Sequence, residues 1–264
     1  MKRAALFVLL AGHLWAAGPE TDFAAAETLY LQRDFAAARA AFEQLAATEP
    51  ARTSHRYFLG KIAIRERRFP EAVALLRAVV DESPGNADYQ HWLGNAHAWS
   101  AAEAKNLADR AAHARRSLAA YRRAVQLAPD NVPARLSLIN LLRHVPALLG
   151  GGIARARAEA AEVERRDPRR GAYARALLLA HEGHYDDALA TLRVLLADQP
   201  DYYAANLLVG HIASRSGRGA TEARAALERC LRLTPTEFDE PHDVAHELLA
   251  ALARPTAALV ATSD

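Results

Sequence analysis

The sequence predicts an all-α solenoid, a stack of helix-turn-helix repeats that ends in a C-terminal capping helix. The first observation is that the same helix-sized pattern of small and apolar residues precedes six prolines in one register. These are Pro50, Pro84, Pro129, Pro168, Pro200 and Pro235. The second is that alternating β-branched stretches between turn clusters are absent from the sequence. A repeat of this size cannot bury its apolar face alone, so neighbouring repeats must stack.

The pattern describes the second helix of each repeat. Twelve residues before each proline is a small side chain: Ala38, Ala72, Ser117, Ala156, Ala188 and Ala223. Eight residues before is an apolar one: Phe42, Leu76, Tyr121, Ala160, Leu192 and Leu227. Five residues before are Leu45, Val79, Ala124, Val163, Leu195 and Cys230. Steps of four and three place these side chains on one helix face, and proline disfavours continuation of the helix.

The first 18 residues have the features of an export signal. Lys2 and Arg3 are followed by an apolar stretch and then by small residues up to Gly18. The apolar stretch of roughly 14 residues is shorter than the ~20 that span a bilayer as a helix. We therefore expect residues 1–18 to be a signal peptide and the protein to be exported, periplasmic or secreted, from a bacterium. An uncleaved anchor and a cytoplasmic protein with an apolar start are the alternatives.

The remaining chain divides into six repeats, a cap and a tail. The expected repeats are about 19–52, 53–86, 87–131, 132–170, 171–202 and 203–237, followed by a cap at 240–253 and a disordered tail at 254–264. The third and fourth repeats are longer than the others. In the third, no Pro interrupts residues 87–128 and their one Gly is Gly94, so both helices are expected to extend and to turn near Lys105 and Asn106. In the fourth, Pro146 and Gly150 to Gly152 predict a loop.

Several of these features resemble the tetratricopeptide repeat family. Pro50 and Pro84 are 34 residues apart, and Leu59-Gly60 and Leu93-Gly94 are similar to the Leu-Gly pair of its first helix. The long third hairpin, with Pro146 before Leu149-Gly150-Gly151-Gly152, resembles a group of exported bacterial members that share a Pro-x-Leu-Gly-Gly-Gly loop and have no assigned activity. The resemblance implies a non-catalytic scaffold or adaptor of the bacterial cell envelope that binds a protein or peptide partner of unknown identity.

A peptide groove is the first candidate site. Lys61, Asn95 and Asn140 each follow a first-helix leucine by two residues, so they are expected to line one track of the concave surface. Amide side chains both donate to and accept from a peptide backbone, and Lys61 is placed for a carboxylate. The other predicted groove residues are Arg65, His91, Trp99 and His144. The alternative is a solvated face whose Asn side chains only satisfy local backbone groups.

The sequence contains two further candidate sites, a glycine-rich loop and a histidine pair. Leu149 and Gly150 to Gly152 form a candidate partner loop, since a ligand could lie at this junction of the third and fourth repeats. His242 and His246 lie one helical turn apart, which would suit a metal, but no third ligand is evident. A small regulatory or metal-binding protein is therefore the alternative function.

The charge balance and the single cysteine argue against a nucleic-acid-binding protein and against a disulfide-stabilised one. The chain has 33 basic and 31 acidic residues, and removal of Lys2 and Arg3 would leave these numbers equal. A neutral chain lacks the basic footprint of a nucleic-acid binder. Cys230, the single cysteine, occupies a packing slot and cannot form an intramolecular disulfide. We expect no catalytic residues, no cofactor and no bound metal, no membrane span after the signal, and a monomer or weak homo-oligomer.

Overall fold

The computed structural model describes residues 19–253, and these form thirteen α-helices, one short 3₁₀ helix and no β-strand. The predicted signal peptide (1–18) and tail (254–264) lie outside the described residues. The first helices of the repeats are α1 (Pro19–Leu31), α3 (Thr53–Arg65), α5 (Ala87–Glu103), α7 (Val132–Leu142), α9 (Pro168–His181) and α11 (Tyr203–Ser216). The second helices are α2 (Phe35–Thr48), α4 (Phe69–Glu82), α6 (Leu107–Leu127), α8 (Ile153–Arg166), α10 (Tyr185–Asp198) and α12 (Ala220–Cys230). The last helix is α13 (His242–Ala253).

The burial of the second helices confirms the predicted solenoid. All six small residues of the pattern are 0% exposed, which allows the partner helix to approach closely. The apolar residue four positions later is at most 7% exposed in every copy, and so is the one three positions after that. Each of these helices packs against the first helix of its own repeat, and all of them but α12 pack against the first helix of the next repeat. The helices of residues 19–253 therefore stack without interruption, and their buried apolar side chains form five clusters along the stack.

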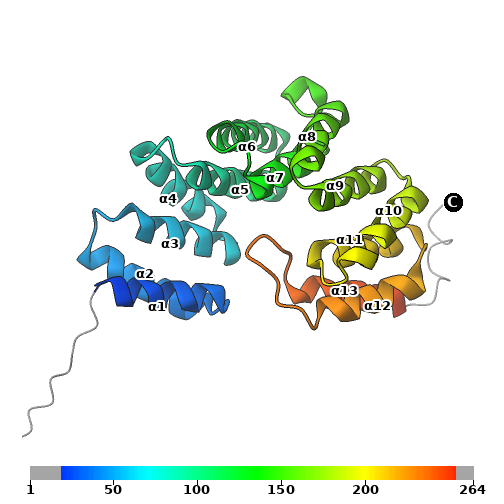
Figure 1. Cartoon of the computed structure of the whole chain (residues 1–264). Coiled ribbons are helices and arrows are strands. Elements are labelled where there is room, and N and C mark those ends of the chain that lie inside the picture. The colour runs from blue at the N-terminus through cyan, green and yellow to red at the C-terminus, as the bar shows by residue number, and fades with distance from the viewer. Residues whose placement is uncertain (1–18, 254–264) are drawn as a thin grey trace, which may run out of the picture.

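The first helices form the inner row of a curved stack. α3 contacts α5, α5 contacts α7, α7 contacts α9, and α9 contacts α11. Figure 1 shows the resulting arc, with α1 and α2 at one end and α11 to α13 at the other. The second helices lie on the outside of this arc. Among residues 19–253, no helix combines the length and the hydropathy needed to cross a bilayer.

The two long repeats differ from the others as the glycine and proline positions indicate. α5 and α6 have 17 and 21 residues, and the turn between them ends at Asn106, whose side chain accepts a hydrogen bond from the Asp109 amide at 2.8 Å. Between α7 and α8 the chain forms a loop that contains the 3₁₀ helix η1 (Ala147–Leu149). Gly150 and Gly152 in this loop have positive φ angles of 92° and 106°.

The chain between α12 and α13 departs from the predicted pattern. The spacing to Pro235 predicts a helix that continues toward this proline, but α12 ends at Cys230. The next eleven residues, 231–241, have no regular secondary structure. In Figure 1 they form the long orange loop that reaches from α12 toward the N-terminal helices α1 and α3. This segment contacts residues far away along the sequence, among them Tyr30, Lys61 and Arg65.

Candidate functional site

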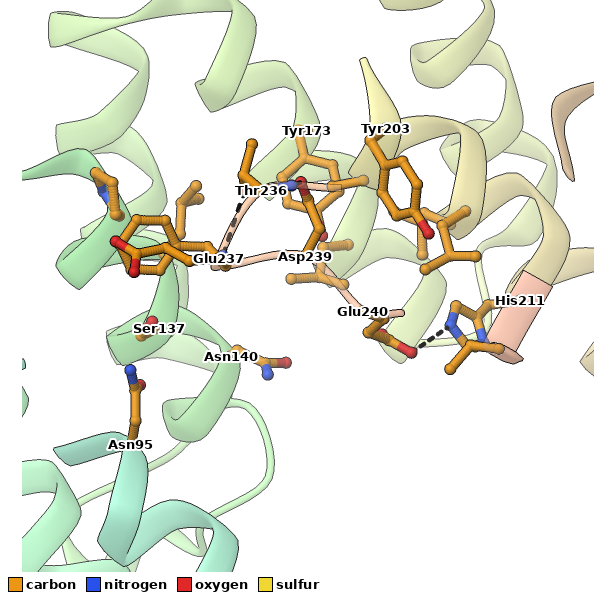
Figure 2. Close-up of a pocket in the computed structure, with 18 of the residues that line it drawn as sticks. Asn95, Ser137, Asn140, Tyr173, Tyr203, His211, Thr236, Glu237, Asp239 and Glu240 are labelled. Atoms are coloured by element: carbon orange, nitrogen blue, oxygen red, sulfur yellow. Dashed lines mark hydrogen bonds and ion pairs between the residues drawn. The ribbon is translucent and has the colours of Figure 1, made fainter. Parts of the chain in front are cut away.

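The concave side of the arc forms a large open groove with a volume of about 2380 Å³. Its walls come mainly from α3, α5, α7, α9 and α11, together with the start of the second helices and residues 233–244. Pockets for small ligands measure roughly 300–1,000 Å³. The cavity is larger than that range, and Figure 2 shows how side chains from α5, α7, α9 and α11 surround the segment that crosses it.

That segment is the end of the α12–α13 loop, residues Thr234–Pro241, which we call the groove loop. It carries three carboxylates and one aromatic side chain between Pro235 and Pro241. Its own structure is a small turn in which the Thr236 amide and hydroxyl donate to Asp239 Oδ2 at 2.8 and 2.7 Å. Glu237 and Glu240 extend from this turn toward opposite ends of the cavity, as Figure 2 shows. The loop therefore crosses the groove as a turn whose two glutamates point to opposite sides (Figure 2).

Glu237 binds the predicted carboxylate-binding lysine. Lys61 Nζ lies 2.6 Å from Glu237 Oε2, and Lys61 is only 4% exposed. Four aromatic rings surround this ammonium group, with centroid distances of 4.5 Å to Tyr30 and Phe58, 4.8 Å to Trp92 and 5.1 Å to Tyr57. Cation–π contacts of this kind stabilise a desolvated cation by about 2 kcal/mol or more. Burial lowers the pKa of Lys61, while the Glu237 carboxylate acts to raise it.

The neighbouring contacts complete a subsite for a glutamate followed by an aromatic residue. Arg65 Nη2 donates a hydrogen bond to the backbone carbonyl of Glu237. The ring of Phe238 stacks on His91 at 5.4 Å with an interplanar angle of 15°, and it lies 5.9 Å from Trp92. Burial, assisted by the nearby Lys61 charge, lowers the pKa of His91 to about 4. His91 is therefore a neutral stacking surface at pH 7.

The two asparagines lie on the open part of the concave wall. The Tyr121 hydroxyl donates to Asn95 Oδ1 at 2.7 Å, and Arg143 donates to Asn140 Oδ1 at 2.9 and 2.6 Å. Within residues 19–253, neither Nδ2 amide group donates a hydrogen bond. The amide oxygens are therefore fixed by neighbouring side chains, while their N–H groups are available to an acceptor in the cavity.

The other predicted groove residues line the same cavity. Trp99 is 47% exposed and stacks on Phe69 at 6.1 Å, and His144 meets His181 edge to face at 5.0 Å. Lys61 and His91 are the exceptions, because the sequence predicts them on an open face and the structure places them beneath the groove loop. The structure thus brings Lys61, Arg65 and His91 together at one subsite.

The cavity wall is strongly basic although the chain as a whole is nearly neutral. Apart from residues 233–244, the lining contains nine arginines and three aspartates. Glu240 also contacts this wall, since its carboxylate lies 3.4 Å from His211 Nε2. The groove loop places Glu237 and Glu240 against this wall, while Asp239 accepts hydrogen bonds from Thr236 within the loop. Net charge conceals the asymmetry because most acidic residues lie elsewhere on the surface.

The loop formed by Leu149 and Gly150 to Gly152 is held in place by contacts with neighbouring parts of the fold. A Cβ atom at Gly151 would lie 2.1 Å from the Val145 carbonyl oxygen, so only glycine fits there. Arg122 and Arg155 donate hydrogen bonds to the carbonyls of Gly150 and Gly151, each at 2.6 Å. The role of Leu149 and Gly150 to Gly152 in partner contact stays a prediction.

The C-terminal histidine pair has no metal-binding arrangement. His242 Nε2 lies 2.8 Å from the Leu233 carbonyl oxygen, and His246 lies on the exposed side of α13. Among residues 19–253, no group of three His, Cys, Asp or Glu side chains is placed to hold a metal ion. Cys230 is buried, and burial raises the pKa of its thiol to about 12.

Glu237 and Phe238 are the site residues that sequence reasoning missed. They fall at the end of the sixth repeat, where the helical pattern stops. One signal for them exists in the sequence, since Glu237-Phe238-Asp239-Glu240 is an acidic segment with one aromatic residue between two prolines. The repeat spacing does not include this segment, because the pattern covers only the slots before each proline.

Comparisons with known proteins agree with this architecture. Residues 23–87 and 173–238 match the family model described as tetratricopeptide repeat. A thermophilic tetratricopeptide repeat protein of Thermus thermophilus is 18% identical, with a TM-score of 0.63 over 74% of this chain and 98% of its own. A tetratricopeptide repeat protein of Parabacteroides merdae is 14% identical, with a TM-score of 0.57 over 89% and 85% of the two chains. No curated protein sequence is significantly similar to the chain.

Proposed function

We propose that this tetratricopeptide repeat protein is a non-catalytic scaffold that binds an extended segment of a partner protein in its concave cavity. The observation that carries the proposal is the concave cavity itself, which has room for a chain segment and is already crossed by a segment of the same chain. Curved solenoids present such extended concave surfaces to their partners. Asn95 and Asn140 offer free amide N–H groups to the carbonyls of a bound backbone.

Replacing Asn95 and Asn140 together with alanine is expected to weaken the binding of a groove peptide about tenfold, because two net hydrogen bonds contribute about 1–3 kcal/mol. The probe is a peptide selected from a displayed random library against the purified chain. Its dissociation constant is measured by fluorescence anisotropy for the wild type and for Asn95→Ala/Asn140→Ala.

The matched control is Gln44→Ala, which removes an exposed amide that does not line the cavity. Its affinity for the selected peptide should equal that of the wild type. An unchanged affinity for Asn95→Ala/Asn140→Ala would show that the peptide binds outside the groove and would refute the proposal.

We further propose that the scaffold acts in the bacterial cell envelope as an exported protein. The support is the sequence of residues 1–18, with Lys2 and Arg3 before an apolar stretch that ends in small residues. Expression of the full chain in a bacterium should yield a periplasmic protein whose mass lacks the first 17 or 18 residues. Lys2→Glu/Arg3→Glu is expected to slow this processing, since the basic region of a signal is removed. An intact chain recovered only from the cytosol would contradict the export proposal.

A further inference from the structure

We infer that the groove loop is an internal occupant of the peptide site, and that the partner segment is an acidic peptide in which an aromatic residue follows a glutamate. The partner displaces Thr234–Pro241 and takes over its contacts with Lys61, Arg65 and His91. The inference rests on the proposed function, because it names the chemistry of the segment that the cavity accepts.

The first argument is that the loop binds as a ligand rather than as part of the core. It contacts the N-terminal repeats through one carboxylate, one carbonyl and one ring: Glu237 with Lys61 and Tyr30, the Glu237 carbonyl with Arg65, and Phe238 with His91 and Trp92. Phe238 remains 49% exposed, and the cavity extends beside the loop. A few polar contacts and a half-exposed ring hold the segment, so it can leave without opening the helical core.

The second argument is charge. The wall without residues 233–244 has nine arginines against three aspartates, and Lys61 lies beneath the loop. Four of these arginines form ion pairs with carboxylates outside the loop: Arg67, Arg166, Arg169 and Arg170. The excess of basic groups near the loop therefore comes from the other five arginines and Lys61. The carboxylates of Glu237, Asp239 and Glu240 neutralise part of this excess. A partner that displaces the loop must replace those carboxylates, because an unpaired buried Lys61 and an uncovered basic wall would cost free energy. A neutral or basic peptide cannot do this.

The third argument is selectivity at Lys61. Its ammonium contacts four aromatic rings and pairs with the Glu237 carboxylate at 2.6 Å. This geometry accepts one carboxylate on an extended chain. The His91 ring, inclined by 40° to the ring of Trp92, then stacks with the ring of the following residue, and Trp92 contacts its side. The subsite thus selects a glutamate–aromatic pair rather than negative charge alone.

A tethered segment competes strongly even when its contacts are weak. Its effective concentration lies in the mM range, so a loop with an intrinsic Kd of about 100 µM lowers the affinity of a competing peptide about tenfold. The test therefore compares the wild type with Glu237→Gln/Phe238→Ala, in which the loop loses its carboxylate and its ring. The probe is a fluorescent, end-capped peptide with the sequence of residues 234–241.

The probe is expected to bind Glu237→Gln/Phe238→Ala about tenfold more tightly than the wild type. Glu240→Gln removes the contact with His211 and should increase the affinity for the probe by less than about tenfold. It replaces Glu237→Gln/Phe238→Ala in the test if that variant does not fold. Arg232→Gln is the matched control, since Arg232 is exposed and does not line the cavity. Circular dichroism monitors the helical content of every variant.

Four results would overturn the inference. One is equal affinity of the probe for the wild type and for both loop variants, which would show that the loop does not compete. Another is equal binding of a probe in which Gln and Ala replace Glu237 and Phe238, which would remove the assigned chemistry. A third is tighter binding of single-stranded DNA than of the peptide probe by Glu237→Gln/Phe238→Ala. Library peptides of other chemistry that still depend on Asn95 and Asn140 would overturn this inference and leave the proposed function standing.

Discussion

Replacing Gly171 with alanine is expected to destabilise the protein by about 2 kcal/mol or more, because the new methyl group has no space. An ideal Cβ at this position would lie 2.3 Å from Glu164 Cα and 2.8 Å from Glu164 N. These are backbone atoms of α8, so α8 and α9 would have to move apart. The gain in helix propensity from Gly to Ala is about 1 kcal/mol, which is smaller than the expected cost. Urea unfolding followed by circular dichroism measures the difference.

Gly85→Ala is the control for this substitution. A Cβ at Gly85 would have no atom within 4 Å, and the residue does not have a positive φ. Alanine should therefore be neutral or stabilise the protein by up to about 1 kcal/mol through the unfolded chain. Equal stability of Gly171→Ala and the wild type would show that the α8–α9 junction relaxes freely, contrary to the close packing at Gly171.

The helical framework could be predicted from sequence because its determinants are local. The small slots, from Ala38 to Ala223, recur at fixed distances from a proline, and all six are completely buried. Helix periodicity and proline chemistry act over a few residues, so a single sequence displays them. The same reasoning placed Asn95, Asn140 and Trp99 on the concave wall.

The groove loop could not be predicted in this way, because its contacts are not local. The Tyr30 hydroxyl lies 3.3 Å from Glu237 Oε2, although the two residues are 207 positions apart. The periodicity of a helix relates residues a few positions apart, so it gives no indication that Tyr30 and Glu237 are in contact. Lys61 is likewise a residue type that pattern analysis places in solvent, and only the rings of three first helices make its burial possible. Composition also failed to predict the basic wall, since net charge averages over the whole surface.

Glu237→Ala is expected to destabilise the protein by about 3 kcal/mol at pH 7, since removal of one partner leaves the other charge buried and unpaired. The Lys61 side chain is 5% exposed, so it cannot reach bulk water without rearrangement of its aromatic surroundings. Glu237 is 28% exposed and keeps part of its hydration. The lysine therefore accounts for most of the expected loss, which urea unfolding would measure.

The pH dependence separates this explanation from simple loss of loop contacts. Burial lowers the pKa of Lys61 below its usual value, and Glu237 opposes that effect. Without Glu237 the pKa in the folded state falls further, while in the unfolded state it stays near ~10.4. As pH rises through the folded-state pKa, the unfolded chain binds more protons than the folded one, so stability increases. The destabilisation caused by Glu237→Ala should therefore be smaller at pH 9 than at pH 7.

Lys61→Met supplies the matched variant for the pair. Methionine fills the aromatic enclosure without a charge, and Glu237 can turn toward solvent, so this change should cost less than about 1 kcal/mol. Lys61→Met/Glu237→Ala should then be more stable than Glu237→Ala alone. The gap in unfolding free energy between this double variant and Lys61→Met should be the same at pH 7 and pH 9. If the double variant were as unstable as Glu237→Ala, the buried charge of Lys61 would not be the cause. The ion pair would then serve to hold the loop and not to neutralise a lysine.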